Sequence, residues 1–141
     1  MRLLDVNVLV NAHRRDAERH AGFHAYVEDI IHGDEPYAVT DMVVNGFMRI
    51  VTNRRLPIPS TTEEALGFAD QIRNQPHAVV VNPGARHWEI FVRLCKEAQA
   101  TGKLLPDAYL AALAIEHGCE FVTCDGDFAK FPGLRWRHPL N

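Results

Sequence analysis

The sequence predicts an α/β fold, a three-layer sandwich with a mostly parallel central sheet. Short apolar runs rich in β-branched residues alternate with longer segments in which apolar residues recur at helical spacing. The alternation runs through the chain without an internal repeat or a linker, which favours helices on both faces of one sheet. At 141 residues the chain has the usual size of one domain, so residues 1–141 are expected to form a single domain.

The first part of the chain predicts two short strands and three helices. Residues 2–4 form an apolar strand, and the apolar run 6–10 continues directly into a helix. Helical spacing predicts a second helix over 20–32, which a glycine ends. A short strand is expected at 37–39. Residues 41–51 then form a helix, because a threonine or an aspartate can cap its start.

The second part continues the same alternation. Residues 61–64 offer a capping box for a further helix, and 78–81 read as a buried strand because they are β-branched and lie between prolines. Helices are expected over 87–100 and 106–117, the latter beginning at a proline and ending at a glycine. Residues 120–123 form the last expected strand.

Composition excludes several classes of protein. The net charge of −3 argues against a protein that coats nucleic acid, although local arginine clusters could contact phosphates. No apolar run reaches the roughly 18 to 20 residues that span a bilayer, and we expect a cytoplasmic protein. The three cysteines are odd in number and show no CxxC spacing, which predicts reduced residues of the core.

Four aspartates stand at or near the ends of apolar segments. Asp5, Asp107 and Asp125 each follow such a segment, and Asp127 lies two residues further on. Since ligands bind beyond the carboxyl ends of parallel strands, Asp5 and Asp125 should meet at one edge of the sheet. Clustered carboxylates repel one another unless a cation neutralises them. Oxygen ligands suit Mg²⁺ or Mn²⁺, and an ion so held supports phosphodiester hydrolysis.

Each of these acids also has a purely structural interpretation. Asp5 could cap the helix that follows it, and Asp107 could be an ordinary first-turn residue whose charge suits the helix dipole. Asp125 and Asp127 could be turn formers beside Gly126. Their combination, rather than any one of them, indicates a metal site.

Three segments resemble the acidic motifs of PIN-domain nucleases, and in particular the VapC-type toxins of VapBC toxin-antitoxin pairs. They are LDVNVLV at 4–10, LPDAYLAALA at 105–114 and FVTCDGDF at 121–128, in the family's order and across essentially the whole chain. The resemblance implies a PIN-like fold in which Asp5, Asp107 and Asp125 hold the metal. It also implies that Asp127 helps to orient the attacking water.

The resemblance further implies what surrounds these acids and what they do. Asn7 would brace Asp5, and Thr123 would hydrogen-bond within the site. The activity would be that of an endoribonuclease dependent on Mg²⁺ or Mn²⁺, which hydrolyses RNA to leave a 5′-phosphate and a 3′-hydroxyl. The toxins of this family are small and often homodimeric, and the implied partner is a VapB-like antitoxin whose tail blocks the acidic edge.

One position departs from the family pattern. Gly46 stands where the family usually carries a glutamate on its third helix. Asp41 and Asn45, one helical turn apart, are candidate substitutes, although neither occupies the matching position. The departure leaves open a PIN-like module that binds RNA or protein with weakened catalysis. A phosphotransfer enzyme is a weaker alternative, because Asn7 replaces the second aspartate such enzymes need.

Histidines and aromatic residues suggest two further kinds of site. His20 and His24 have the spacing of zinc ligands on one helical face, but no third ligand follows, and surface positions are the expected outcome. Aromatic residues could stack on unpaired bases, although burial is their expected role. These are Tyr26, Trp88, Tyr109 and Trp136.

Overall fold

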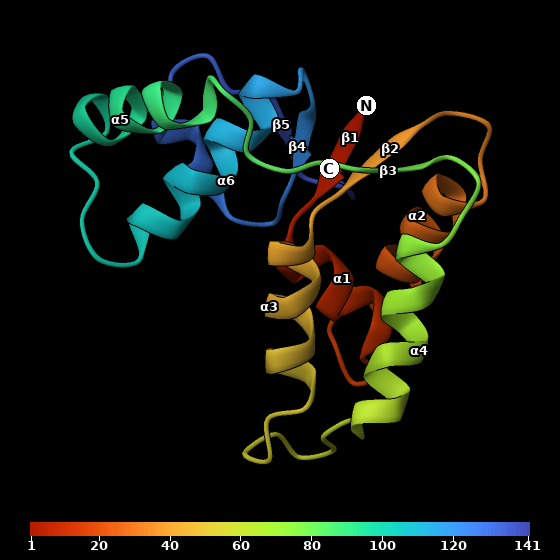
Figure 1. Cartoon of the computed structure of the whole chain (residues 1–141). Helices are drawn as coiled ribbons and strands as arrows, with labels where there is room; N and C mark the ends of the chain where they lie inside the picture. Colours follow the sequence, from red (N-terminus) through yellow and green to blue (C-terminus); the bar gives the residue numbers. More distant parts are fainter.

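Five short strands form the sheet of the computed structural model, which describes residues 1–141 (Figure 1). All neighbouring strands are parallel, in the order β3-β2-β1-β4-β5. The α/β architecture with a parallel central sheet is therefore confirmed. The strands are β1 (Arg2–Leu4), β2 (Tyr37–Val39), β3 (Ala78–Val80), β4 (Glu120–Val122) and β5 (Trp136–Arg137).

Six α-helices and one 3₁₀ turn connect the strands. The chain moves from β1 to β2 to β3 in one direction and then returns to the other side of β1 at β4, so right-handed crossovers place the helices on opposite faces. Figure 1 shows α5 and α6 gathered apart from α1 to α4. The elements are α1 (Val6–His13), α2 (His20–Ile31), α3 (Asp41–Val51), α4 (Thr62–Arg73), α5 (His87–Glu97), α6 (Leu104–Glu116) and η1 (Gly126–Lys130).

The core lies on both sides of the central strands. Leu3 of β1 and Phe121 of β4 are almost fully buried, and they pack with Phe47 of α3 and Leu113 of α6 in one apolar cluster. Burying each such side chain stabilises the fold by about 1.5–3 kcal/mol. This packing fixes β1 and β4 rigidly, and both strands lead directly into expected site residues.

Several expectations about individual elements are wrong. Strand β3 is not buried: it pairs only with β2 at the sheet edge, which leaves Val79 and Val80 about 40% exposed. Helix α5 ends at Glu97, before the expected end at residue 100, and α6 begins at Leu104 rather than at Pro106. Pro106 is tolerated there because the first turn of a helix has no partner for its N–H groups.

The strand order reverses at β1, which lies between β2 and β4. Leu4 is paired with Val122 in the parallel register of β1 and β4, so both strands end at the same level. Open α/β sheets bind ligands at such a reversal point, beyond the carboxyl ends of the strands. Asp5 and Thr123 are the residues that follow these two ends.

No helix in the structure is long and apolar enough to cross a membrane. All three cysteines are free; Cys119 is buried, and Cys95 and Cys124 are half-buried. Burial raises the pKa of each of the three thiols. The three side chains thus lie in or near the core, as expected.

Candidate active site

Asp5 is a buried carboxylate at the start of α1. Its backbone N–H continues the sheet by donating to Val122 O at 2.9 Å, and its Oδ1 caps α1 by accepting from the Val6 N–H at 2.7 Å. Burial raises the pKa of Asp5, an effect opposed by its hydrogen bonds and increased by the charge of Asp125. Asp5 therefore has the capping role that its sequence position allowed, and it also lies among other acids.

Thr123 connects the ends of β1 and β4. Its buried hydroxyl donates to Asp5 Oδ2 at 2.7 Å and accepts from the backbone N–H of Asp125 at 3.0 Å. The Asn7 amide donates to the same hydroxyl at 3.2 Å and to Asp5 Oδ2 at 3.3 Å, and accepts from the Cys124 N–H at 3.1 Å. The structure thus has the contacts expected of Asn7 and Thr123, and they fix the orientation of Asp5.

Asp107 approaches this edge from the first turn of α6. Its pKa is raised to about 6, first by burial and then by the negative charges of Asp125, Asp5 and Asp127. Lys103, at the start of α6, acts in the opposite direction. The four acids, from three distant segments, thus share one electrostatic neighbourhood. Lys103 was not singled out from the sequence, where only its place before a helix could have indicated it.

Asp125 and Asp127 also form the turn after β4. Asp125 Oδ1 accepts from the Asp127 N–H at 2.9 Å, at the start of η1. Asp127 is exposed and lies 3.5 Å from Lys130 Nζ. Both residues therefore have the turn-forming role that was considered for them, and the charge of each still acts on Asp107.

The donor set fits a hard divalent ion. It consists of carboxylate oxygens, and two of the carboxyl groups have raised pKa values because burial and repulsion disfavour their charge. A cation would relieve that cost. No three acidic, histidine or cysteine side chains are close enough to enclose an ion. An ion at this edge would therefore be bound through one or two carboxylates and would keep several waters, as Mg²⁺ can.

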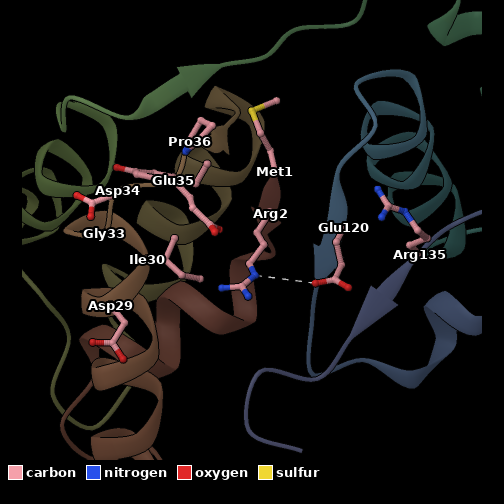
Figure 2. A pocket seen from close by; sticks show the side chains of 11 residues that line it. Met1, Arg2, Asp29, Ile30, Gly33, Asp34, Glu35, Pro36, Glu120 and Arg135 are labelled. Carbon is pink, nitrogen blue, oxygen red and sulfur yellow. Dashed lines mark ion pairs between the residues drawn. The ribbon is translucent and has the colours of Figure 1, made fainter.

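A polar hollow at the opposite edge of the sheet does not share this chemistry. It has a volume of about 600 Å³ and lies at the amino ends of β1, β2 and β4 (Figure 2). There Arg2 and Glu120 form an ion pair at 4.0 Å, and Arg135 lies nearby. Basic and acidic groups are mixed, so no cation is needed, and the four acids at the other edge remain the candidate site.

Known proteins decide the family. The profile of the PIN domain matches residues 2–134. The chain belongs to the PIN domain family. It is 43% identical over 140 residues to Ribonuclease VapC31 of Mycobacterium tuberculosis (strain ATCC 25618 / H37Rv), with 99% of each chain covered. It is also 42% identical over 142 residues to VapC ribonuclease Mb2897 of Mycobacterium bovis, with 100% of this chain and 97% of the relative covered.

Solved structures confirm the PIN fold at low sequence identity. VapBC2 from Rickettsia felis, bound to a DNA fragment from its promoter, gives a TM-score of 0.73 at 16% identity, with 97% of both chains covered. VapC20 of Mycobacterium tuberculosis, described as a sarcin-ricin loop cleaving toxin, gives a TM-score of 0.64 at 18% identity, with 96% of this chain and 99% of that chain covered. The expected resemblance to VapC-type PIN proteins is therefore confirmed.

Gly46 of this PIN domain lies against the first helix of the site. A Cβ at position 46 would be 3.0 Å from Cγ2 of Val6, the residue after Asp5. The missing side chain allows α3 to approach α1 closely beside the acids. Asp41 is a poor substitute for the absent glutamate, because its carboxylate is held by Arg73 at 2.9 Å and its pKa is lowered by that partner. Asn45 is exposed one turn further along α3.

The histidine pair on α2 does not form a three-ligand site. The Nδ1 atoms of His20 and His24 face the backbone oxygens of Asn11 and Ala12, at 2.9 and 3.4 Å. His24 is exposed and His20 is half-buried. Trp88, expected to be buried, is 68% exposed, because α5 packs through His87, Ile90 and Leu94 instead.

Proposed function

We propose that this chain is an endoribonuclease of a type II toxin-antitoxin pair that uses Mg²⁺ or Mn²⁺. One observation carries the proposal: Asp107, with a pKa of about 6, is forced into the neighbourhood of Asp5, Asp125 and Asp127. Clustered acids that repel one another in this way are typical of sites that bind a cation. Two kinds of observation support the proposal. One is the cluster of acids at the sheet edge, and the other is the 41–43% identity of the chain to VapC ribonucleases.

Asp5, Asp107 and Asp125 are the residues proposed to hold the ion, one or two of them directly and the others through its waters. When bound, the ion supplies a water of lowered pKa and stabilises the charge that develops on phosphate oxygens. The side chains of the protein would orient the reacting groups and transfer protons. Thr123 and Asn7 hold Asp5 in a single orientation, and Asp125 with the exposed Asp127 can accept hydrogen bonds from the attacking water. Hydrolysis then leaves a 5′-phosphate and a 3′-hydroxyl.

The proposed partners are RNA and a VapB-like antitoxin. The relatives are named ribonucleases, and one fold neighbour is a toxin-antitoxin complex from Klebsiella pneumoniae. An antitoxin that covers the acidic edge would need a cationic group to offset the four carboxylates. Homodimer formation, expected from the family resemblance, remains a prediction.

The binding-only alternative is not favoured. Gly46 motivated it, yet relatives that share 41–43% of residues over nearly the whole chain are named ribonucleases. The network around Thr123 is also complete, and a site that only bound RNA would not need a buried carboxylate fixed by three donors. Metal-dependent cleavage is therefore the function to test first.

Cleavage of a labelled RNA by the purified chain tests the proposal. We expect products with 5′-phosphates in Mg²⁺ or Mn²⁺, none after chelation, and none from Asp107→Asn. Asp29→Asn is the matched control, because Asp29 is an exposed acid beside the hollow at the other edge of the sheet. Cleavage that survives chelation or Asp107→Asn would refute the metal mechanism.

A further inference from the structure

A second hollow lies at the same edge of the sheet as the acids. It has a volume of about 560 Å³ and is bounded by the first residues of α3, the loop after β3, Phe91 of α5 and most of α6. Thr40, which lines it, follows the end of β2 as Asp5 follows the end of β1, and these neighbouring strands pair Leu3 with Ala38. A ligand seated in the hollow would therefore be a neighbour of the phosphodiester group at the acids.

The walls of the hollow are mainly apolar. Met42 and Leu105 are each nearly 40% exposed, and Phe91 and Tyr109 form an edge-to-face pair with centroids 5.7 Å apart. Pockets of roughly 300–1,000 Å³ that combine apolar walls with a few polar groups are typical small-molecule sites. An aromatic ring system of modest size suits such walls.

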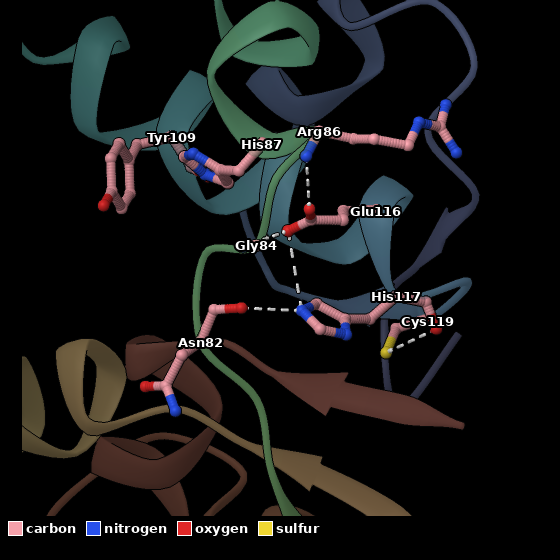
Figure 3. A network of polar contacts seen from close by, with 8 residues as sticks. All are labelled: Asn82, Gly84, Arg86, His87, Tyr109, Glu116, His117 and Cys119. Carbon is pink, nitrogen blue, oxygen red and sulfur yellow. Dashed lines mark hydrogen bonds and ion pairs between the residues drawn. The ribbon is translucent and has the colours of Figure 1, made fainter.

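Polar groups without a structural task lie at the rim. Thr40 is buried at the N-cap of α3, yet its side chain makes no capping hydrogen bond. Figure 3 shows the Asn82 side-chain amide directed away from His117, which is bonded to the Asn82 backbone oxygen instead. A hydroxyl and an amide are the groups that read the edges of a nucleobase.

The wall formed by the loop after β3 is held in place. Glu116 accepts from the backbone N–H groups of Gly84 at 2.8 Å and Arg86 at 3.0 Å, and His117 Nε2 bonds Asn82 O at 2.8 Å (Figure 3). Position 84 must be glycine for this contact, because a Cβ there would be 2.8 Å from Glu116 Oε2. A fixed wall lowers the ordering cost of binding.

The charge of the rim allows a polyanion to approach. Asp41, the one acid that lines the hollow, is neutralised by Arg73, with Nε 2.9 Å from Oδ1. RNA recognition by sequence commonly uses unstacked bases held against aromatic side chains. The position of Thr40 beside Asp5 favours RNA over a protein surface, because the hollow lies at the edge where RNA would be cut.

We propose that this hollow binds one unstacked nucleobase of the RNA, next to the bond that is cleaved, and so sets base preference. The proposal rests on the ribonuclease function proposed above. Tyr109 and Phe91 would contact the ring, and Thr40 and Asn82 would read its edge.

Saturation-transfer NMR can measure the binding of each of the four uncharged nucleosides to the full chain. With a chelator present, any binding comes from this subsite and not from the metal site. We expect one nucleoside to bind best, and Asp107→Asn to bind it equally well. Tyr109→Leu and Thr40→Val should each weaken binding by about tenfold. Leu66→Ala, an exposed apolar change on α4, is the matched control and should bind normally.

Cleavage supplies the second measurement. Thr40→Val replaces the hydroxyl with a methyl group of similar size. Its kcat/KM for RNA with the preferred base should fall toward the value for RNA with the other bases. Equal losses for all bases would overturn the proposal, as would nucleoside binding unaffected by both variants. RNA cleavage by the wild type would still support the nuclease in that case.

The competing occupant of the hollow is a second copy of the chain. Sedimentation of the wild type and of Leu105→Glu distinguishes a base subsite from a dimer interface. A base subsite predicts the same oligomeric state for both proteins, because Leu105 would then contact RNA rather than a second copy of the chain. If the wild type is a dimer that Leu105→Glu dissociates, the hollow is covered by the other subunit and the proposal is wrong.

Discussion

Among the acids of the site, burial and mutual repulsion have their largest effect on the pKa of Asp107. Its folded pKa of about 6 exceeds the ordinary 3.8, so the folded protein binds this proton more tightly than the unfolded chain does. The resulting stability is fully present below about pH 4 and is lost as pH rises through about 6. Without metal, the ionised carboxylate thus opposes folding at neutral pH.

Asp107→Asn should therefore be more stable than the wild type at high pH, although it is inactive. We expect a gain on the order of 1–3 kcal/mol in the free energy of unfolding at about pH 8, and little difference at about pH 4. Urea titrations with chelator present measure both. Equal stabilities at about pH 8 would mean that the acids do not repel one another as the structure indicates.

Thr123 tests the role of orientation separately from charge. Thr123→Val keeps the shape of the side chain but leaves Asp5 Oδ2 and the Asp125 N–H without their hydroxyl partner. We expect a cost of about 1–3 kcal/mol in stability and a 10- to 100-fold loss of cleavage or metal affinity.

Thr123→Ser supplies the control for that experiment. Serine retains the hydroxyl, so cleavage should return to near the wild-type rate even if the lost methyl group costs some stability. If serine and valine were equally impaired, packing rather than hydrogen bonding would be the function of Thr123.

At the scale of elements, the close approach of α1 and α3 explains why a glutamate cannot simply be restored. Gly46→Glu would place Cβ 3.0 Å from Cγ2 of Val6. We expect it to lower the free energy of unfolding by about 1–3 kcal/mol through overpacking. Val6→Ala combined with Gly46→Glu should recover part of that loss, and thermal unfolding of the two single variants and the double variant measures the coupling.

The same series tests what the missing acid does. If the double variant folds and cleaves RNA faster than Val6→Ala alone, the family glutamate position is functional in this chain as well. An unchanged rate would show that the acids at 5, 107 and 125 suffice without it.

Most strands and helices could be predicted from the sequence because their apolar residues recur with different periods. The sequence could not show which face of a helix or strand is buried. Helix α5 carries two adjacent stripes with the same spacing, one at residues 87, 90 and 94 and one at residues 88, 91 and 95. Only the packing of α5 against α6 decides that the stripe at 87, 90 and 94 is buried. Likewise, a β-branched run such as β3 reads the same at an edge as in the centre of a sheet. The two-residue strand β5 and the turn η1 are too short to leave a periodic signal.

Asp5 and Asp125 were predictable because they follow strand ends, and parallel strands bring those ends to one edge. Asp107 lies in the first turn of α6 and was indicated by its resemblance to a family motif. The close approach at Gly46 was not, because the contact with Val6 depends on how α3 packs across α1. The hollow lined by Thr40 and Tyr109 was also hidden, since its walls come from α3, α5, α6 and the loop after β3.

At the scale of the whole molecule, the acidic edge makes stability depend on both pH and metal. A ligand that binds only the folded state adds RT ln(1 + [L]/Kd), which is about 2.7 kcal/mol at one hundred times Kd. The ion must displace the proton of Asp107, so its affinity should fall as pH drops below about 6. Without metal, ionisation of Asp107 should lower the free energy of unfolding as pH rises from about 4 to about 6. With Mg²⁺ bound, this loss should not occur.

Thermal unfolding at about pH 5 and about pH 8, with and without Mg²⁺, measures this coupling. We expect Mg²⁺ to raise Tm clearly at the higher pH and only slightly at the lower one, because carboxylates bind the ion in their ionised form. Asp107→Asn should show little response at either pH, whereas Asp29→Asn should respond like the wild type, since its acid lies at the far edge of the sheet. A Tm increase of equal size in Asp107→Asn would place the ion elsewhere on the molecule.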